Sequence, residues 1–143
     1  MTPSPACLSL IRRFESCCLT AYWDSLGAVW TIGWGHTGPE VHAGLVWTQE
    51  QADEALEHDA QAAGLAVMRL VDIQMTQGEF DALTDFVFNE GAGRLASSTL
   101  LKLMNGGDIV GAGNQLLRWD WAGGKVVAGL AERRQAELQL WNS

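Results

Sequence analysis

The chain has 143 residues, of which 48% are hydrophobic and 18% are charged. This length and balance predict a single globular domain, residues 1–143, and exclude a disordered chain. The net charge of −8 disfavours a nucleic acid as the main partner. No apolar run approaches the roughly 20 residues of a membrane span. Residues 1–15 lack a basic leader followed by an apolar core, so we expect no signal peptide, no membrane insertion and a cytoplasmic monomer.

The charges are distributed unevenly along the chain. Five acidic residues and no Lys or Arg lie from Thr48 to Asp59, whereas six of the nine basic residues lie from Arg94 to Arg134. The second half can therefore present a locally positive surface to a polymer that carries anionic groups. A solvated helix face explains the acidic run at least as well.

A helix followed by strands is predicted at the start of the chain. Ser4 and Pro5 are typical of a helix start, and apolar residues then recur at helical spacing up to Glu15. Residues 19–36 are rich in β-forming side chains, with a turn at 25–27. We expect a hairpin-like sheet directly after the first helix.

The rest of the chain is predicted to be helical. A capping box at Thr48 opens a helix to about Leu65, and a second capping box begins at Thr76. Short helices over 98–104 and 108–119, a break at 123–124 and a last helix over 129–141 follow in that order. One helix, a small antiparallel sheet and then helices only give an α+β fold with the sheet at one end. A helix that joins two such lobes leaves a cleft, where ligands commonly bind.

Two carboxylates, Glu15 and Asp24, lie nine residues apart beside aromatic side chains. Acid-catalysed glycoside cleavage requires such a pair, because one group protonates the leaving oxygen while the other activates water or attacks the sugar. Glu15 ends a buried helix and could be partly desolvated, as suits a general acid. The alternatives are a surface Glu paired with Arg12 or Arg13, and a turn-forming Asp24.

The stretch from Glu15 through Asp24 to Thr31-Ile-Gly-Trp-Gly-His36 resembles the catalytic segment of the phage-type lysozymes, glycoside hydrolase family 24. Weaker similarity at 88–91, 97–101, 117–125 and 129–137 extends the resemblance from Ser9 to Trp141. It implies a lysozyme-like fold of two lobes, a small antiparallel sheet lobe near the N-terminus and a mainly helical C-terminal lobe, with a cleft between them.

The resemblance also implies an activity. A phage endolysin of this kind hydrolyses the β-1,4 bond between N-acetylmuramic acid and N-acetylglucosamine in bacterial peptidoglycan, and a holin-like pore releases it to the wall. Glu15 would donate the proton, and Asp24 with Thr31 would handle the water, with inversion. No metal and no organic cofactor are implied. The sugar contacts carried over from the family are Thr37, Phe88, Asn89 and Thr99.

Other residues acquire expected roles from the same resemblance. Either Arg133 or Arg134 would pair with Glu15 across the cleft, and His36 would pair with Asp59. The segment between Asp24 and Thr31 is one residue longer than in the family pattern. The extra residue either lies in the turn or displaces Asp24 relative to Thr31.

Two further patterns have competing explanations. Gly33 and Gly35 alternate along a predicted strand, which would put them on one face where a saccharide can approach the backbone. The three cysteines are read as reduced, packed thiols, and the alternative is a bridge from Cys7 to Cys17 or Cys18 across Glu15. The spacing of the histidines does not support a zinc site.

Two other functions compete with the muramidase. A chitinase-like hydrolase is one, because chitin also contains N-acetylglucosamine. A catalytically weak or dead module that binds the cell wall is the other. The net charge of −8 and the lengthened Asp24–Thr31 segment favour that module, since an anionic wall repels an acidic protein.

Overall fold

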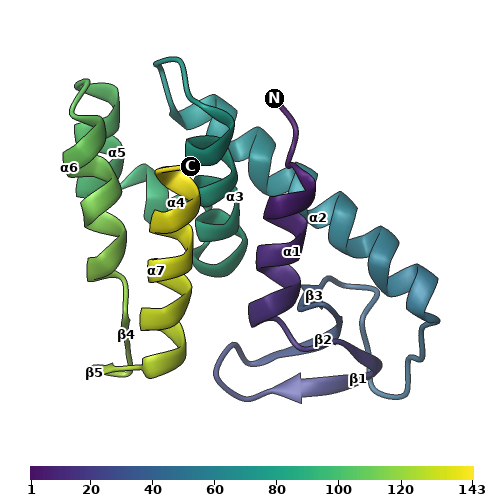
Figure 1. Ribbon diagram of the computed structural model, residues 1–143. Helices are drawn as coiled ribbons and strands as arrows, with labels where there is room; N and C mark the ends of the chain where they lie inside the picture. Colours follow the sequence, from purple (N-terminus) through teal and green to yellow (C-terminus); the bar gives the residue numbers. More distant parts are fainter.

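The computed structural model describes residues 1–143, and Figure 1 shows a small sheet beneath the lower ends of two helices, with the other helices to one side. The helices are α1 (Pro5–Phe14), α2 (Gln49–Leu70), α3 (Gln77–Glu90), α4 (Ala92–Ala96), α5 (Thr99–Asn105), α6 (Ile109–Gln115) and α7 (Ala128–Trp141), with a 3-10 turn η1 (Leu116–Arg118). The strands are β1 (Cys18–Asp24), β2 (Val29–Gly33), β3 (His36–Thr37), β4 (Trp121–Ala122) and β5 (Lys125–Val126). No helix combines the length and apolarity needed to cross a membrane.

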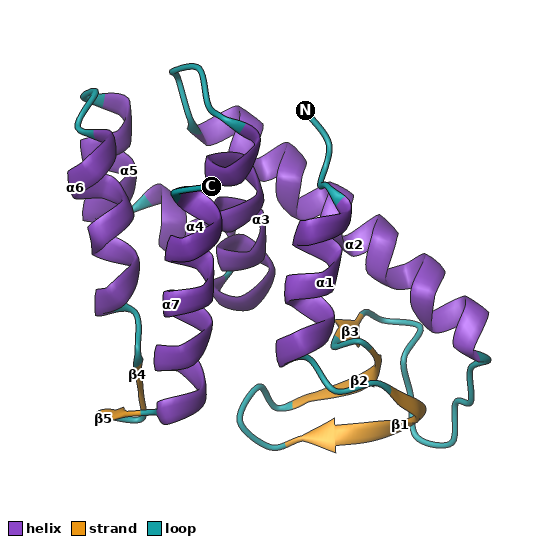
Figure 2. Cartoon of the chain, viewed as in Figure 1, coloured by secondary structure: helices purple, strands orange, loops and turns teal.

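The elements form two lobes, as Figure 2 shows by secondary structure. Strands β1, β2 and β3 make an antiparallel sheet in chain order, which we call the sheet lobe. Helices α3 to α7 make the helical lobe. Helix α2 contacts strands of the first lobe and helices α3 and α4 of the second, so it joins the two. The predicted α+β arrangement is confirmed.

Capping explains where three of the long helices begin. Ser4 caps α1 by accepting the Cys7 backbone N–H at 3.3 Å. Thr48 and Thr76 form complete capping boxes that open α2 and α3, as their sequences predict. Helix α2 ends at Leu70 rather than near Leu65, because apolar residues remain buried at helical spacing over its last turns.

Helix α3 is the centre of the molecule. Its residues from Phe80 to Val87 are all buried, and it packs against α1, α2, α4 and α7. The main core of 16 buried residues gathers around it. A smaller core joins α1 to α2 through Ile11 and Leu56, and Phe88 packs against both cores. The lobes are therefore held by continuous apolar packing behind the cleft.

The structure corrects two expectations about the secondary structure. A second antiparallel pair, β4 and β5, stands where only a chain break was expected, and Gly123 and Gly124 form its turn with φ of 58° and 78°. Glycines adopt positive φ without steric cost, so this turn closes a hairpin instead of ending an element. Helix α4 was not expected, since five residues give too little periodicity to detect.

Candidate functional site

Glu15 lies at the end of α1, where the chain turns toward the sheet lobe. It is the C-cap residue, and its backbone N–H donates to the Ile11 carbonyl at 2.8 Å. Its side chain is 24% exposed, so the expected partial desolvation is confirmed. Oε1 of Glu15 accepts a hydrogen bond from Nη1 of Arg133 at 2.9 Å. The partner is a residue 118 positions away on α7, and not Arg12 or Arg13.

Arg133 is clamped between two carboxylates. Its Nε and Nη2 donate to the two oxygens of Asp85 at 2.9 Å and 2.8 Å, while Nη1 reaches Glu15. Burial lowers the pKa of the Arg133 guanidinium, but the bonds with Asp85 and Glu15 outweigh burial and raise it. A bidentate fork fixes the guanidinium plane, so Arg133 holds one oxygen of Glu15 in a set position. Of the two arginines that the sequence left open, Arg133 is the one that faces Glu15.

Gly35 brings the backbone against the other oxygen of Glu15. It has a φ of +82°, and a Cβ placed on it would lie 2.9 Å from Oε2 of Glu15. Gly33 ends β2 with a φ of +64°. The two glycines therefore do not alternate along one strand: Gly35 lies in the turn between β2 and β3. Positive φ at both positions and the lack of room at Gly35 explain the Gly-x-Gly pattern.

Asp24 lies at the end of β1, at the start of the hairpin. Its Oδ1 accepts the Leu26 backbone N–H at 3.1 Å, so Asp24 does shape the turn. Asp24 pairs with Val29, and Tyr22 pairs with Thr31. Four residues, 25–28, connect the two strands, and Ala28 among them takes a φ of 52°.

The strand register places Asp24 and Thr31 on one face of the sheet. Thr31 is opposite Tyr22 on β1 and opposite Thr37 on β3, and Asp24 is two residues from Tyr22. Side chains directly opposite share a face, and a shift of two residues returns to it. Thr31 is 3% exposed, and its Oγ1 donates to the Val29 carbonyl at 3.4 Å. The register thus keeps Asp24 and Thr31 on the same face of the sheet.

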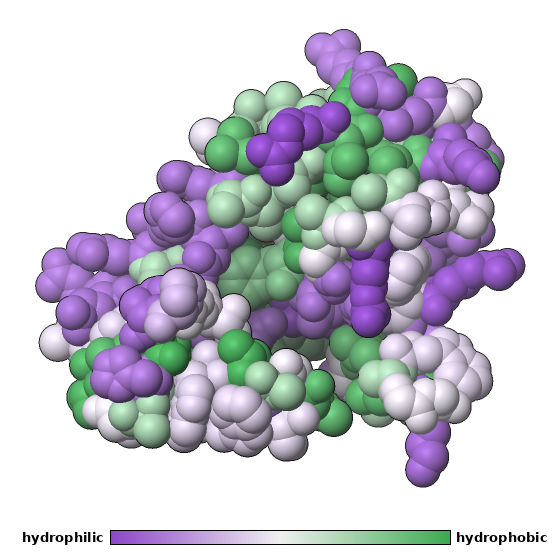
Figure 3. Space-filling view, turned by 180° about the vertical axis from the view of Figure 1, so that it is seen from behind, coloured by the Kyte–Doolittle hydropathy of each residue, from purple (hydrophilic) through white to green (hydrophobic).

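A hollow of about 400 Å³ opens where the sheet lobe meets α2 and α3. Figure 3, which views the molecule from behind, shows this face hollowed between its lower part and the helices above. Thr37 and Phe88 line the hollow together with Gly35 and Arg69. Two of the four expected sugar contacts therefore lie in one cavity, beside the glycine that touches Glu15.

The other two expected sugar contacts lie elsewhere. Thr99 is exposed at the start of α5 and lines a second hollow of about 470 Å³ with Trp119, Trp121 and two arginines. Asn89 lines neither hollow, and its Oδ1 accepts a hydrogen bond from Nη2 of Arg134 at 2.6 Å. Arg134 is thus a partner of α3 residues and not of Glu15.

His36 bridges two carboxylates, of which only one was expected. Its Nδ1 lies 2.6 Å from Oδ2 of Asp59, which confirms the expected pair, and its Nε2 lies 2.6 Å from Oε1 of Glu40. Desolvation lowers the pKa of His36, but the hydrogen bonds to Glu40 and Asp59 outweigh it and raise the pKa. The bond to His36 in turn lowers the pKa of Glu40.

The cysteines are three free thiols. Cys7 is fully buried near the start of α1, and burial, followed by the charges of Asp81 and Asp85, raises the pKa of its thiol. Cys17 and Cys18 lie beyond the far end of the same helix. A helix rises about 1.5 Å per residue, so a bridge across Glu15 would exceed the Cα separation of a disulfide unless α1 unwound.

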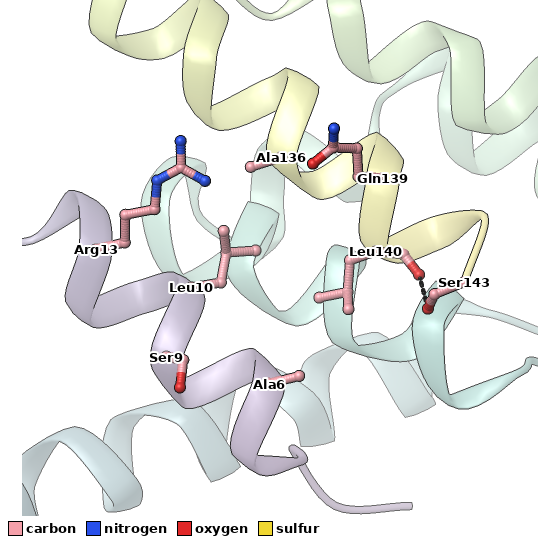
Figure 4. A pocket seen from close by; sticks show the side chains of 8 residues that line it. All are labelled: Ala6, Ser9, Leu10, Arg13, Ala136, Gln139, Leu140 and Ser143. Carbon is pink, nitrogen blue, oxygen red and sulfur yellow. Dashed lines mark hydrogen bonds between the residues drawn. The ribbon is translucent and has the colours of Figure 1, made fainter.

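One further groove lies away from the candidate residues. It lies between α1 and α7, has a volume of about 370 Å³ and contains none of them. Figure 4 shows Ala6, Leu10 and Leu140 among the side chains that line it. The hollow beside Glu15 is therefore the cavity that brings candidate residues together. No cluster of three or more His, Cys, Asp or Glu side chains is placed to hold a metal ion.

Sequence reasoning missed Asp85 and Glu40. Asp85 had a detectable signal, because an acid at the centre of the apolar run from Phe80 to Phe88 needs a buried partner. Glu40 had none, since it lies in a loop whose path the sequence does not specify.

Comparisons with known proteins agree with this fold. Residues 12–137 match the family model described as phage lysozyme. The chain is 40% identical over 142 residues to an endolysin of Bacillus phage B103, covering 99% of this chain and 54% of that protein. It is 39% identical to an endolysin of Acyrthosiphon pisum secondary endosymbiont phage 1, covering 95% of this chain and 94% of that one. The chain spans about half the length of the Bacillus phage relatives that it matches.

Solved structures show the same fold. The muramidase domain of SpmX from Asticaccaulis excentricus superposes with a TM-score of 0.89 at 33% identity, over 98% of this chain and 97% of that domain. The lysozyme-like, two-lobe arrangement is therefore confirmed. The family model matches most of the chain, and the endosymbiont phage endolysin is 39% identical over nearly its full length. The chain therefore belongs to the phage lysozyme family.

Proposed function

We propose that this chain is an N-acetylmuramidase that hydrolyses the β-1,4 bond between N-acetylmuramic acid and N-acetylglucosamine in bacterial peptidoglycan. One observation carries the proposal above all. Glu15, a partly buried carboxyl group, is held by Arg133 on one oxygen and meets the Gly35 backbone with the other, beside a cavity between two lobes.

Glu15 acts as the general acid in this proposal. Because Arg133 occupies Oε1, the proton that reaches the glycosidic oxygen is carried on Oε2, next to Gly35. Placement of the acid by a fixed partner spares the reaction the entropy of orienting it. Protonation of the leaving oxygen accompanies the development of an oxocarbenium-like sugar.

Asp24 and Thr31 handle the water. Both side chains belong to the same face of the sheet lobe, as the register supports. Asp24 takes a proton from a water molecule that attacks the anomeric carbon from the face opposite the leaving group, and the Thr31 hydroxyl orients that water. Attack by water in a single displacement inverts the configuration.

The saccharide extends over both hollows in this proposal. Thr37 and Phe88 contact sugar beside Glu15, and Thr99 contacts the chain further along, where Trp119 and Trp121 offer aromatic faces for stacking. Asn89 contributes through its amide nitrogen, because its oxygen is engaged by Arg134.

Purified peptidoglycan provides the test. Incubation with the chain should lower turbidity and release new reducing ends on muramic acid, and chitin should release none. Reducing ends on N-acetylglucosamine or release from chitin would overturn the bond specificity. Binding to peptidoglycan without any release, across a range of ionic strengths, would instead identify a wall-binding module.

The route to the wall and the assembly state are also proposed. We infer a monomer, made in the host cytoplasm and released through a holin-like pore, with no nucleic-acid partner. Expression in bacteria with and without a co-expressed pore protein tests this. Lysis that requires the pore supports the route, and lysis by the chain alone contradicts it.

A further inference from the structure

Arg69 is a cation in the hollow between the sheet lobe and α2 that the proposed chemistry does not use. It lies in the last turn of α2, and it is the only Lys or Arg between Arg13 and Arg94. Thr37 and Phe88, two of the proposed sugar contacts, line the same hollow. Its volume of about 400 Å³ is within the range of small-ligand sites, roughly 300–1,000 Å³. A sugar bound here therefore shares its space with a single arginine.

One face of α2 forms a wall of the hollow. Ala62, Ala66 and Arg69 are four and three positions apart and all line the hollow, so they share this face of the helix. Asp59, three positions before Ala62, extends the same face and also lines the hollow. The small alanines leave room in the middle of the wall, and one charged residue lies at each end of it.

The two charged residues of this wall differ in their partners. Oδ2 of Asp59 lies 2.6 Å from Nδ1 of His36, so this carboxylate is already engaged within the protein. Arg69 is exposed, and no carboxylate of the chain lies within ion-pairing distance of its guanidinium. Arginine binds carboxylates through two parallel N–H bonds. The guanidinium of Arg69 is therefore free to bind a carboxylate that comes from outside the chain.

The two sugars of peptidoglycan differ in charge. N-acetylmuramic acid is N-acetylglucosamine with a lactyl ether on its O3 oxygen. That lactyl group ends in a carboxylate, or it is joined through an amide to a stem peptide that has carboxylates of its own. N-acetylglucosamine carries no charge. A site that bonds a charged substrate group disfavours an analogue without that group, so an unpaired arginine can tell the two sugars apart.

We propose that Arg69 binds a carboxylate of the muramic acid residue, on its lactyl group or its stem peptide, and so selects the muramoyl sugar in this hollow. This role rests on the proposed muramidase function and names the substrate group that the hollow recognises. The surroundings require such a cation, because the chain has a net charge of −8 and five acidic residues lie from Thr48 to Asp59. Without Arg69, an anionic sugar would meet no Lys or Arg in the hollow.

A cation in the last turn of a helix also has a structural explanation, because it interacts favourably with the helix dipole. Lys102 provides the matched control for that effect. It is exposed in the last turn of α5 and lines neither hollow. Arg69→Gln and Lys102→Gln each remove one positive charge from a helix end. Both variants should fold, with melting temperatures within about 3 °C of wild type.

Binding to chains that cannot cleave provides the test. In a Glu15→Gln background, fluorescence titration measures the affinity for three soluble glycans. The first is a peptidoglycan tetrasaccharide with stem peptides, the second is the same tetrasaccharide with free lactyl carboxylates, and the third is a neutral chito-oligosaccharide. Arg69→Gln should weaken the binding of anionic glycan by about three- to tenfold and leave the affinity for the neutral glycan unchanged.

The two anionic glycans distinguish the sources of the carboxylate. A loss with the peptide-bearing glycan alone assigns the carboxylate to the stem peptide, and a loss with the peptide-free glycan alone assigns it to the lactyl group. A loss with both shows that the guanidinium reaches either one. Arg69→Lys should recover part of the affinity, because it keeps the charge but not the bidentate geometry.

Three results would overturn the role of Arg69. The first is an unchanged affinity of Arg69→Gln for all three glycans. The second is an equal loss in Lys102→Gln, which would make the effect one of net charge. The third is an equal loss with the neutral glycan, which would indicate a general change of the hollow.

Kinetics separate this role from the proposed function. If the wild-type chain cleaves peptidoglycan, Arg69→Gln should raise KM for soluble fragments by about three- to tenfold with little change in kcat. An unchanged KM would contradict the role of Arg69 and leave the muramidase assignment standing. If the wild-type chain cleaves no peptidoglycan, the muramidase assignment fails, while the three titrations still decide whether Arg69 binds a carboxylate.

Discussion

The two carboxyl groups of the proposed reaction are held in opposite ways. Glu15 is fixed by long-range contacts, because Arg133 on the last helix and Gly35 in the sheet lobe meet its two oxygens. Asp24 is fixed by local contacts, since its oxygen accepts a backbone N–H only two residues away and its strand partner is Val29. The proposed proton donor is thus tied to the packed interior, whereas the acid proposed to handle water is part of an exposed hairpin.

This difference explains which region tolerates a change of length. Loop 25–28 is exposed, so this turn can adjust to an additional residue at little cost. A residue inserted between Phe14 and Glu15 would move Glu15 away from Arg133. Asp85 would then be bonded to an arginine that has lost its second carboxylate partner. The contrast predicts that loss of Arg133 acts on both structure and activity, and that loss of the Asp24 carboxylate acts on activity alone.

The largest expected effect comes from Glu15→Gln. An amide keeps the shape and still meets Arg133 but cannot donate the proton, so lysis should fall at least about 10²-fold. Circular dichroism should be unchanged. More than about a tenth of wild-type lysis from a folded variant would exclude Glu15 as the general acid.

Arg133→Met should cost the most stability. It leaves the fully buried Asp85 without its cation, and breaking a buried pair costs about 3–5 kcal/mol. Urea denaturation gives the free energy of unfolding. Arg13→Met is the control, because Arg13 is exposed on α1 and should lose less than about 1 kcal/mol. Similar losses for both variants would mean that the Asp85 clamp is not a structural centre.

Asp24→Asn should separate activity from stability. The amide oxygen still accepts the Leu26 N–H, so the hairpin persists, but an amide cannot take a proton from water. We expect at least about tenfold lower kcat with a melting temperature within about 1 °C of wild type. A large loss of stability would show that Asp24 matters mainly as a turn residue.

His36→Asn should have the smallest effect, and one that depends on pH. The folded pKa of His36 is raised, so its stabilisation is complete below the unfolded value of about 6.5 and fades as pH rises through the folded pKa. The melting temperature should fall more at pH 5.5 than at pH 8.5. His58→Asn is the control, since His58 is 84% exposed. Equal losses at both pH values would make His36 a neutral packed side chain.

Much of the fold could be predicted because short sequence patterns determine where its elements begin. Capping at Ser4, Thr48 and Thr76 located three of the four long helices, and β-forming residues located the sheet. The β4–β5 hairpin escaped prediction because two residues per strand show no alternation. The turn at Gly35 escaped because the reason for its glycine is a contact with Glu15, which is 20 positions earlier in the chain.

The site was predictable only as far as its residue types. The motif identified Glu15 and Asp24, but the choice between Arg133 and Arg134 depends on which face of α7 meets α1 and which meets Asn89. Both arginines are buried, so burial patterns alone could not separate them. Asp85 and Arg133 are 48 positions apart in the sequence. Their pairing follows from the packing of α3 against α7.

The configuration of the first-formed product tests the central claim most directly. If Glu15 donates the proton while Asp24 and Thr31 deliver a water molecule, the β-linked substrate yields the α-anomer first. Proton NMR of soluble peptidoglycan fragments, recorded before mutarotation equilibrates the anomers, distinguishes the two. The account predicts initial accumulation of the α-anomer. Initial accumulation of the β-anomer would show retention through a glycosyl-enzyme on Asp24, and would contradict it.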